Sequence, residues 1–216
     1  MVQYGEDFVN LFAPNLWELS IDEIPKIDES FPEAHLAMWN VAARELFNGE
    51  WKPLVALAVR QFMRRSILAV SLYEDGRKKL EEFSFNHRRD RPNLKAYFGA
   101  LDAFEGCILQ LDFCVENLRH VLESEDAKNL LGSTRSLSEL CKSIRHSGAR
   151  AKGSEQSKSR KLFPVFFENC GVTNGKEGVT FGELRDLAND FASLTSRIFH
   201  FDASKQDEAR VHSPKP

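Results

Sequence analysis

The sequence has little of what turn-rich, cross-linked or membrane-spanning proteins need. Its 216 residues include only 12 Gly and 8 Pro, too few for an all-β sandwich with many tight turns. The four cysteines form neither a CxxC pair nor a zinc-ligand pattern, so we expect reduced thiols, no metal and no other cofactor. No run reaches the roughly 18 apolar residues of a membrane-spanning helix, and the N-terminus lacks the apolar core of a signal peptide. We therefore expect a cytoplasmic protein without membrane contact.

The short motifs of common catalytic and nucleotide-binding sites are missing as well. GxxxxGK[ST], GxGxxG, GxSxG and HExxH do not occur, nor does the ExxH pair of di-metal helical bundles. A net charge of −3 argues against a generic nucleic-acid binder. What is present, 42% hydrophobic residues with 17 Phe, is typical of a globular domain with bulky core side chains.

Apolar residues recur every three or four positions over long segments, which predicts helices. The predicted helices span 30–48, 53–73 with an extension to 83, 93–122, 136–147 and 180–198. The extension of the second helix requires that Gly76 be tolerated within it. The longest, over 93–122, also carries a stripe of small residues that would let another helix approach closely: Ala96, Ala100, Ala103 and Cys107.

Capping boxes and one turn signal set several of these bounds. Ser136 with Glu139, and Thr180 with Glu183, have the spacing at which a side-chain oxygen and a glutamate satisfy each other's backbone amides. Asn174-Gly175 stands between two β-rich runs, which is a strong hairpin signal. A small β-hairpin is therefore expected directly before the last helix.

These segments predict a mainly α protein, an antiparallel helical bundle of four to five helices with one small β-hairpin before the last helix. The bundle is expected over residues 30–200. Residues 1–29 form an N-terminal arm, which we expect to pack through Phe8, Phe12 and Trp17. Residues 201–216 are polar and are expected to be a disordered tail.

Charge is distributed unevenly along the chain. Between residues 142 and 161, seven Lys or Arg stand against one acid, Glu155, so this segment carries +6 and the remaining residues carry −9. Such a Gly- and Ser-rich basic segment suits phosphate groups, most of all those of RNA. The other interpretation is a solvated loop whose cations favour the negative end of the preceding helix. The phosphate-binding candidates are Arg150, Lys152, Lys158, Arg160 and Lys161.

His146 is the candidate catalytic residue. The neighbouring cations Arg145 and Lys142 should lower the pKa of its imidazole and favour the neutral base near pH 7. A neutral imidazole can accept a proton from a ribose 2′-hydroxyl, while an adjacent cation stabilises the charged phosphorane. The alternative is a structural histidine that caps helix carbonyls or packs beneath the basic segment.

Glu105 and Asp112 border the apolar stripe of the longest helix, seven residues apart. Carboxylates in that position are costly unless they are paired, so we expect structural polar roles for both. The expected partners are Arg60, Arg64 or His146.

The order of elements, with Tyr97-Phe98 and Leu101 to Cys107 in a long helix and Leu140 to His146 in a short one, resembles the HEPN (higher eukaryotes and prokaryotes nucleotide-binding) helical-bundle superfamily. The resemblance covers about residues 93–199. It implies a four-to-five-helix bundle, a homodimer, and RNA cleavage or a role in a prokaryotic defence or stress system. The active family motif has an Arg before the His at the positions that Cys141, Leu140 and Glu139 occupy here.

Two functional hypotheses follow from different classes. The first is an RNA- or nucleotide-contacting HEPN-like protein, in which any metal-independent cleavage would use His146, with Lys142 or Arg145 on the phosphate. The second is a non-catalytic protein-interaction module in which the basic segment is solvated or orders on contact with a protein partner.

Overall fold

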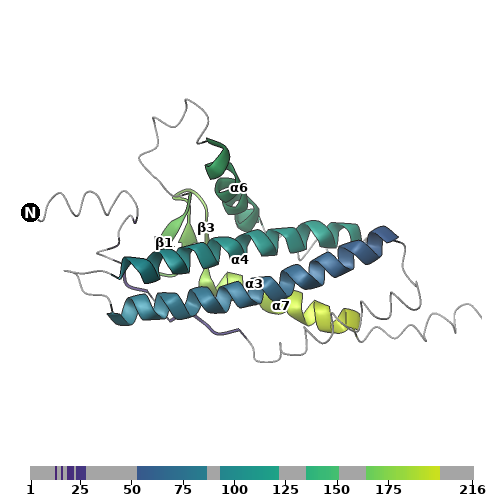
Figure 1. Ribbon diagram of the computed structural model, residues 1–216, viewed down its shortest axis with the longest axis horizontal. Coiled ribbons are helices and arrows are strands. Elements are labelled where there is room, and N and C mark those ends of the chain that lie inside the picture. The colour runs from purple at the N-terminus through teal and green to yellow at the C-terminus, as the bar shows by residue number, and fades with distance from the viewer. Residues whose placement is uncertain are drawn as a thin grey trace, which may run out of the picture.

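The computed structural model describes residues 13, 16, 19–21, 23–27, 53–86, 93–121, 135–150 and 164–199. Within these residues the protein is mainly helical, with a small antiparallel sheet before the last helix, as expected (Figure 1). In chain order the elements are α3 (Pro53–Asn86), α4 (Leu94–Val121), α6 (Arg135–Arg150), β1 (Phe166–Glu168), β2 (Gly171–Thr173), β3 (Gly178–Thr180) and α7 (Phe181–Phe199). The helix expected over 30–48, the tail over 201–216, and Phe8, Phe12 and Trp17 lie outside the described residues.

α3 and α4 lie side by side as a long antiparallel pair (Figure 1). α3 begins at Pro53, where the missing amide costs nothing, and continues past Phe83 to Asn86. Gly76 is tolerated because of its surroundings: a Cβ there would lie 2.9 Å from Cδ2 of Phe104 on α4. The two helices therefore pack tightly at a position where one of them has no side chain. The small residues predicted to line such a contact, from Ala96 to Cys107, are all buried.

The sheet has three antiparallel strands in the order β1-β2-β3. The predicted hairpin around Asn174 is confirmed as β2–β3, where Asn174 Oδ1 accepts from the amides of Lys176 and Glu177, both at 2.9 Å. Gly175 has a φ of 86°, which favours glycine. β1 was not predicted separately, because the run before Asn174 reads as one strand although Asn169 and Cys170 turn it back on itself.

Aromatic rings join the sheet to α4. Phe167 of β1 makes edge-to-face contacts with Tyr97 at 5.2 Å and with Phe104 at 5.8 Å between ring centroids. Phe104 also contacts Tyr73 of α3 and Phe181, the first residue of α7. All five side chains are at most 2% exposed, so they form the dry centre of the core.

The capping box predicted for the last helix is confirmed. The Thr180 amide donates to Glu183 Oε2 at 2.8 Å, and the Glu183 amide donates to Thr180 Oγ1 at 3.1 Å. α7 then packs along α3, where Phe191 meets Phe62 with their rings 5.6 Å apart. The start of α7 is thus fixed by its own first turn before tertiary packing adds to it.

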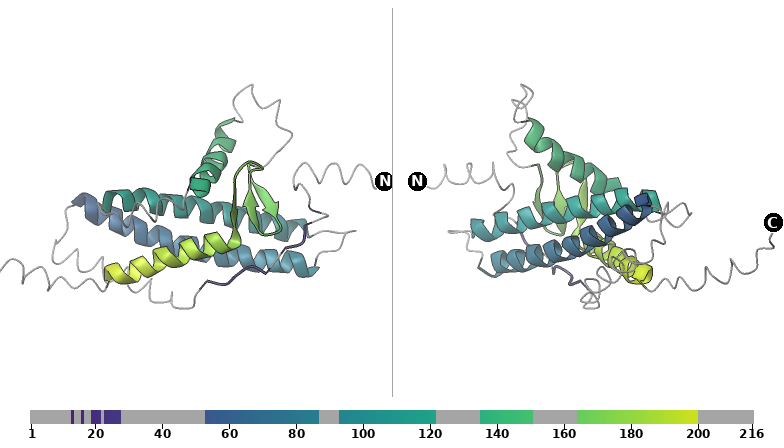
Figure 2. Two further views of the ribbon diagram at one scale, coloured as in Figure 1. Left: turned by 180° about the vertical axis from the view of Figure 1, so that it is seen from behind. Right: turned by 45° about the vertical axis from the view of Figure 1, so that its right-hand side comes forward.

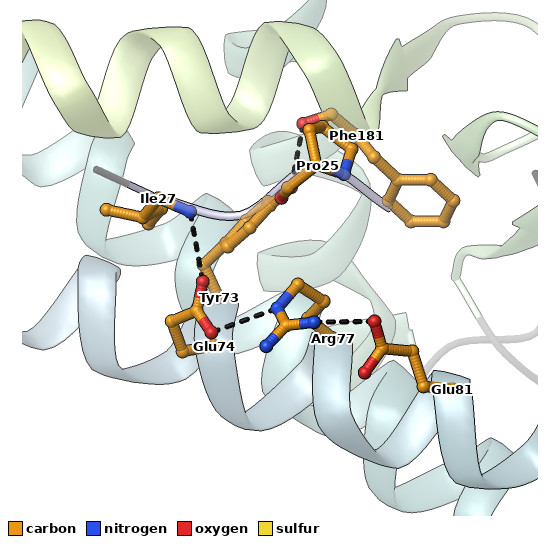
Figure 3. A network of polar contacts seen from close by, with 7 residues as sticks. All are labelled: Pro25, Ile27, Tyr73, Glu74, Arg77, Glu81 and Phe181. Carbon is orange, nitrogen blue, oxygen red and sulfur yellow. Dashed lines mark hydrogen bonds and ion pairs between the residues drawn. The ribbon is translucent and has the colours of Figure 1, made fainter. Parts of the chain in front are cut away.

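The described part of the N-terminal arm is held by α3 (Figure 3). The Tyr73 hydroxyl donates to the carbonyl of Pro25 at 2.7 Å and lies 3.1 Å from the carbonyl of Phe181. Two residues further on, the Ile27 amide donates to Glu74 Oε1 at 3.1 Å. The same side chain, Glu74, accepts from Arg77 Nε at 2.9 Å. The arm therefore docks on a polar network that α3 organises.

α6 differs from its predicted bounds at both ends. It begins at Arg135, one residue before the expected cap Ser136, and continues to Arg150, beyond the expected stop at His146 to Gly148. Gly148 is helical here, which costs only about 1 kcal/mol relative to alanine. The end at Arg150 points away from the α3–α4 pair in each view (Figures 1 and 2). None of the helices in the described part of the chain is long and apolar enough to cross a membrane.

Candidate functional site

α6 is the helix that carries the candidate catalytic residues, and apolar side chains hold it on the bundle. Leu137, Leu140, Cys141 and Ile144 share one face at helical spacing and are all buried. One polar contact adds to this face, because Asn174 Nδ2 in the β2–β3 turn donates to Ser143 Oγ at 2.8 Å. α6 is therefore fixed both to α4 and to the hairpin.

Arg145 anchors α6 to α4. Its guanidinium lies 3.1 Å from Oδ2 of Asp112 and 3.6 Å from Oε1 of Glu116, and its Cζ lies 4.6 Å from the centroid of the Phe113 ring. The Asp112 side chain is only 11% exposed, whereas that of Arg145 is 39% exposed. A residue expected to hold a phosphate is thus already paired with two carboxylates.

The same contact corrects the partner predicted for Asp112. Arg60, Arg64 or His146 were expected, and the structure pairs Asp112 with Arg145, while the side chain of His146 lies outside the described residues. The reason lies in the crossing of α6 over α4, which brings Arg145 onto the face that carries Asp112 and Glu116. Arg60 and Arg64 are exposed on α3.

Lys142 makes a weaker contact. Its Nζ lies 2.7 Å from Oε1 of Glu139, three residues earlier, and the two side chains are 58% and 44% exposed. An exposed pair of this kind contributes little, so the ammonium of Lys142 can exchange this partner for another anion at small cost.

Glu105, expected to resemble Asp112, lies in a different environment. No hydrogen bond or ion pair reaches its carboxylate from the described residues. Burial, and then the charge of nearby Asp102, raise the pKa of Glu105 to about 7. Its carboxyl group is therefore partly protonated at neutral pH.

A second arginine, which the sequence did not single out, lies against the Phe113 ring. Cζ of Arg65 on α3 is 4.7 Å from the ring centroid, and its Nη1 donates to Gln110 Oε1 at 2.7 Å. Arg65 and Arg145 are 80 residues apart in the sequence, so no local pattern could have joined them. The only indication of this contact in the sequence is that Gln110 and Phe113 are three residues apart and therefore lie on the same side of one helix.

Metal-ligand and thiol chemistry can be assessed only for the described residues. They contain no group of three His, Cys, Asp or Glu side chains placed to hold a metal ion. None of the four cysteines forms a disulfide, and burial raises the pKa of Cys107 and of Cys141 to about 12, so these two thiols are protonated.

The remaining candidates lie where the structure gives no side-chain detail. The side chains of His146 and Arg150 are outside the described residues, although their backbone completes α6. Lys152, Lys158, Arg160 and Lys161 are outside as well. Of the three candidate catalytic residues, the structure thus describes the side chains of Lys142 and Arg145, each paired with carboxylates of its own.

Comparison with known proteins adds no relative. No protein-family model matches this chain, and neither the curated proteins nor the solved structures show a significant match to it. The likeness to the HEPN superfamily therefore stays a prediction from the sequence.

Proposed function

We propose that this chain is a HEPN-like helical protein that binds RNA through the basic segment 142–161, without cleaving it. The observation that carries the proposal is the direction of α6. Its apolar face is fixed to the bundle, while the end from which the basic segment continues points away from α3 and α4 (Figure 2). The described end of α6 therefore places the start of the basic segment away from the α3–α4 pair.

Electrostatics supports the same proposal. The segment carries +6 on a chain whose other residues sum to −9, so a polyanion is attracted to one region and repelled by the rest. Contacts from Lys and Arg to phosphates need no sequence preference. We therefore expect binding that depends strongly on salt and weakly on base composition.

The contacts of Arg145 favour binding without cleavage. In the cleavage mechanism, His146 acts as the base and Arg145 or Lys142 holds the phosphate. Arg145 would have to leave Asp112 and Glu116 to do so, and Asp112 would then be buried without its cation. Lys142 has no such constraint, because its pair with Glu139 is exposed on both sides. The homodimer and the role in a defence or stress system belong to the proposal, since both come from the family resemblance.

The decisive experiment measures the affinity of the full chain for a labelled single-stranded RNA by fluorescence anisotropy at several salt concentrations. Replacing Lys158, Arg160 and Lys161 by Gln should weaken binding and flatten the salt dependence by about 0.7 in log–log slope for each phosphate that is no longer bound. The matched control replaces three exposed lysines elsewhere, Lys78, Lys95 and Lys176, by Gln.

The outcomes separate the hypotheses. If the two triple variants lose affinity equally, only the net charge of the protein matters and not the basic segment. That result would overturn the proposal. RNA cleavage that is independent of metal and disappears in His146→Ala would restore the ribonuclease hypothesis.

A protein-interaction module is the second candidate function, and one observation favours it. Leu54 and Leu57 on the first turns of α3 are 80% and 50% exposed, which is unusual for large apolar side chains that lie so close together. If the chain shows no affinity for RNA at low salt, this hypothesis replaces the first.

A further inference from the structure

Three helices meet at the ring of Phe113. Arg65 comes from α3, Phe113 belongs to α4, and Arg145 comes from α6, with guanidinium carbons 4.7 Å and 4.6 Å from the same ring centroid. We call these three residues the arginine–phenylalanine stack. Both distances are typical of a cation above an aromatic face, which fixes the plane of a guanidinium that would otherwise move freely.

The two arginines of the stack differ in how their charge is compensated. Arg145 is paired with Asp112 and Glu116. Arg65, by contrast, donates to the neutral amide oxygen of Gln110, and no carboxylate among the described residues lies within ion-pair distance of it. Its positive charge is half-buried and therefore loses part of its hydration without gaining a counter-charge from the described part of the chain.

Other arginines of α3 are close to Arg65 in the sequence but lie on a different face of the helix. Arg60 and Arg64 are exposed and one helical turn apart, and the helical rotation of about 100° per residue turns both away from Arg65. A guanidinium presents five N–H donors, and Gln110 uses one of those of Arg65. A phosphodiester oxygen is the kind of partner that a planar, partly desolvated guanidinium binds best.

We propose that Arg65 is a phosphate contact for RNA, so that the RNA-binding surface continues from α6 across Phe113 to α3. This inference rests on the proposed function. It adds a position on α3, Arg65, that the RNA strand reaches beyond the basic segment. In this arrangement, stacking on Phe113 orients the guanidinium of Arg65 toward a phosphate, and Arg145 keeps α6 beside the same ring. The other explanation is a stack that only ties the three helices together.

The test uses the full chain and the same labelled RNA. Arg65→Gln removes the charge, and Arg65→Lys keeps the charge but loses the planar donor array. Lys78→Gln is the matched control, because it makes the same change of charge on an exposed position of the same helix, about 20 Å away at 1.5 Å per residue. Thermal melts identify any variant that fails to fold.

If Arg65 contacts phosphate, Arg65→Gln weakens binding about tenfold at low salt and lowers the log–log salt slope by about 0.7. Arg65→Lys keeps the slope and the melting temperature but binds less tightly than wild type, whereas a purely structural arginine would lower the melting temperature together with the affinity. Lys78→Gln leaves both values nearly unchanged.

Two results would overturn the inference in distinguishable ways. If Arg65→Gln binds as wild type does while the Lys158, Arg160 and Lys161 triple variant binds more weakly, RNA binding stands and the stack is structural. If wild type does not bind RNA at all, the proposed function and this inference fall together.

Discussion

The two halves of α4 make different contacts. In the first half, Tyr97 and Phe104 meet the rings of Phe167 and Phe181, and every one of these side chains is buried. In the second half, buried apolar side chains stand beside a charged contact, in which the largely buried Asp112 and the exposed Glu116 pair with Arg145 of α6. We call the first contact the aromatic end and the second the charged end.

The difference shows how one helix serves both stability and binding. Burying large rings yields a contribution that salt does not screen and that involves no titrating group. Ion pairs that keep a third or more of one partner in solvent are weak, screened by salt and exchangeable. The aromatic end therefore holds the fold, and the charged end is where an anionic ligand can compete.

The largest effect is expected at the aromatic end. Phe104→Ala should lower the free energy of unfolding by about 3–5 kcal/mol, because the ring contacts α3, β1 and α7 at once and its removal leaves a cavity. Urea denaturation followed by circular dichroism measures it. Leu57→Ala, at a half-exposed position of α3, is the control and should cost less than about 1 kcal/mol. Similar decreases in the free energy of unfolding for both variants would mean that the aromatic end does not hold the fold.

A smaller effect is expected at the charged end. Arg145→Met should cost about 1–2 kcal/mol, because Asp112 is left nearly buried without its cation. A double-mutant cycle with Asp112→Asn should give a coupling of about 1 kcal/mol, reduced by the exposure of the arginine. The same cycle in 1 M salt tests the interpretation, since a coupling that salt does not reduce would mean that packing dominates this contact.

Glu105 lies between the two ends and should make stability depend on pH. The folded state raises the pKa of Glu105 to about 7, above its value of 4.5 in the absence of structure, so the folded state binds the proton more tightly. Stability should then fall as the pH rises from 4.5 to 7. Glu105→Gln should remove this slope and stabilise the protein at pH 8 by about 1 kcal/mol, once solvent screening is allowed for.

Thermal melts between pH 4.5 and 8 test this prediction. Asp102→Asn is the companion variant, because it removes the second cause of the shift and keeps the first. Its effect should have the same sign and be smaller. A variant at residue 105 that keeps the wild-type slope would assign the pH dependence to another group.

The smallest effect is expected for Lys142. Lys142→Met should change the free energy of unfolding by no more than about 0.5 kcal/mol, because its pair with Glu139 is exposed on both sides. The same substitution should weaken RNA binding, and the contrast between the two measurements separates a binding residue from a structural one. A decrease in stability as large as that of Arg145→Met would contradict the assignment.

Local patterns predicted most of the fold. The periodicity of apolar residues located α3, α4 and α7, and the pairing of Thr180 with Glu183 marked the start of α7, because these signals act within a few residues. The end of α6 was wrong because a glycine stops a helix only when its backbone takes the left-handed conformation, and Gly148 does not. In the region of the expected N-terminal arm, Ala13, Leu16, Ile24 and Ile27 are buried, while Phe8, Phe12 and Trp17 lie outside the described residues.

The site was less predictable because its contacts join separate helices. Glu105 and Asp112 look alike in the sequence, yet only Asp112 lies where α6 brings a cation. Arg65 was missed for the same reason, since its ring partner depends on how α3 and α4 are aligned. Pairings of this kind follow from crossing angles, which periodicity does not contain.

The hydroxyl of Tyr73 has a consequence for the integrity of the whole chain. It touches the carbonyls of Pro25, near the beginning of the chain, and Phe181, where the final helix starts (Figure 3). Deleting the residues up to and including Ile27 would remove the Pro25 carbonyl from the Tyr73 hydroxyl and the Ile27 amide from Glu74, and would expose this part of α3. The neighbouring contact of that hydroxyl with the carbonyl of Phe181 would be uncovered as well, so amide exchange at the first turn of α7 should report the loss.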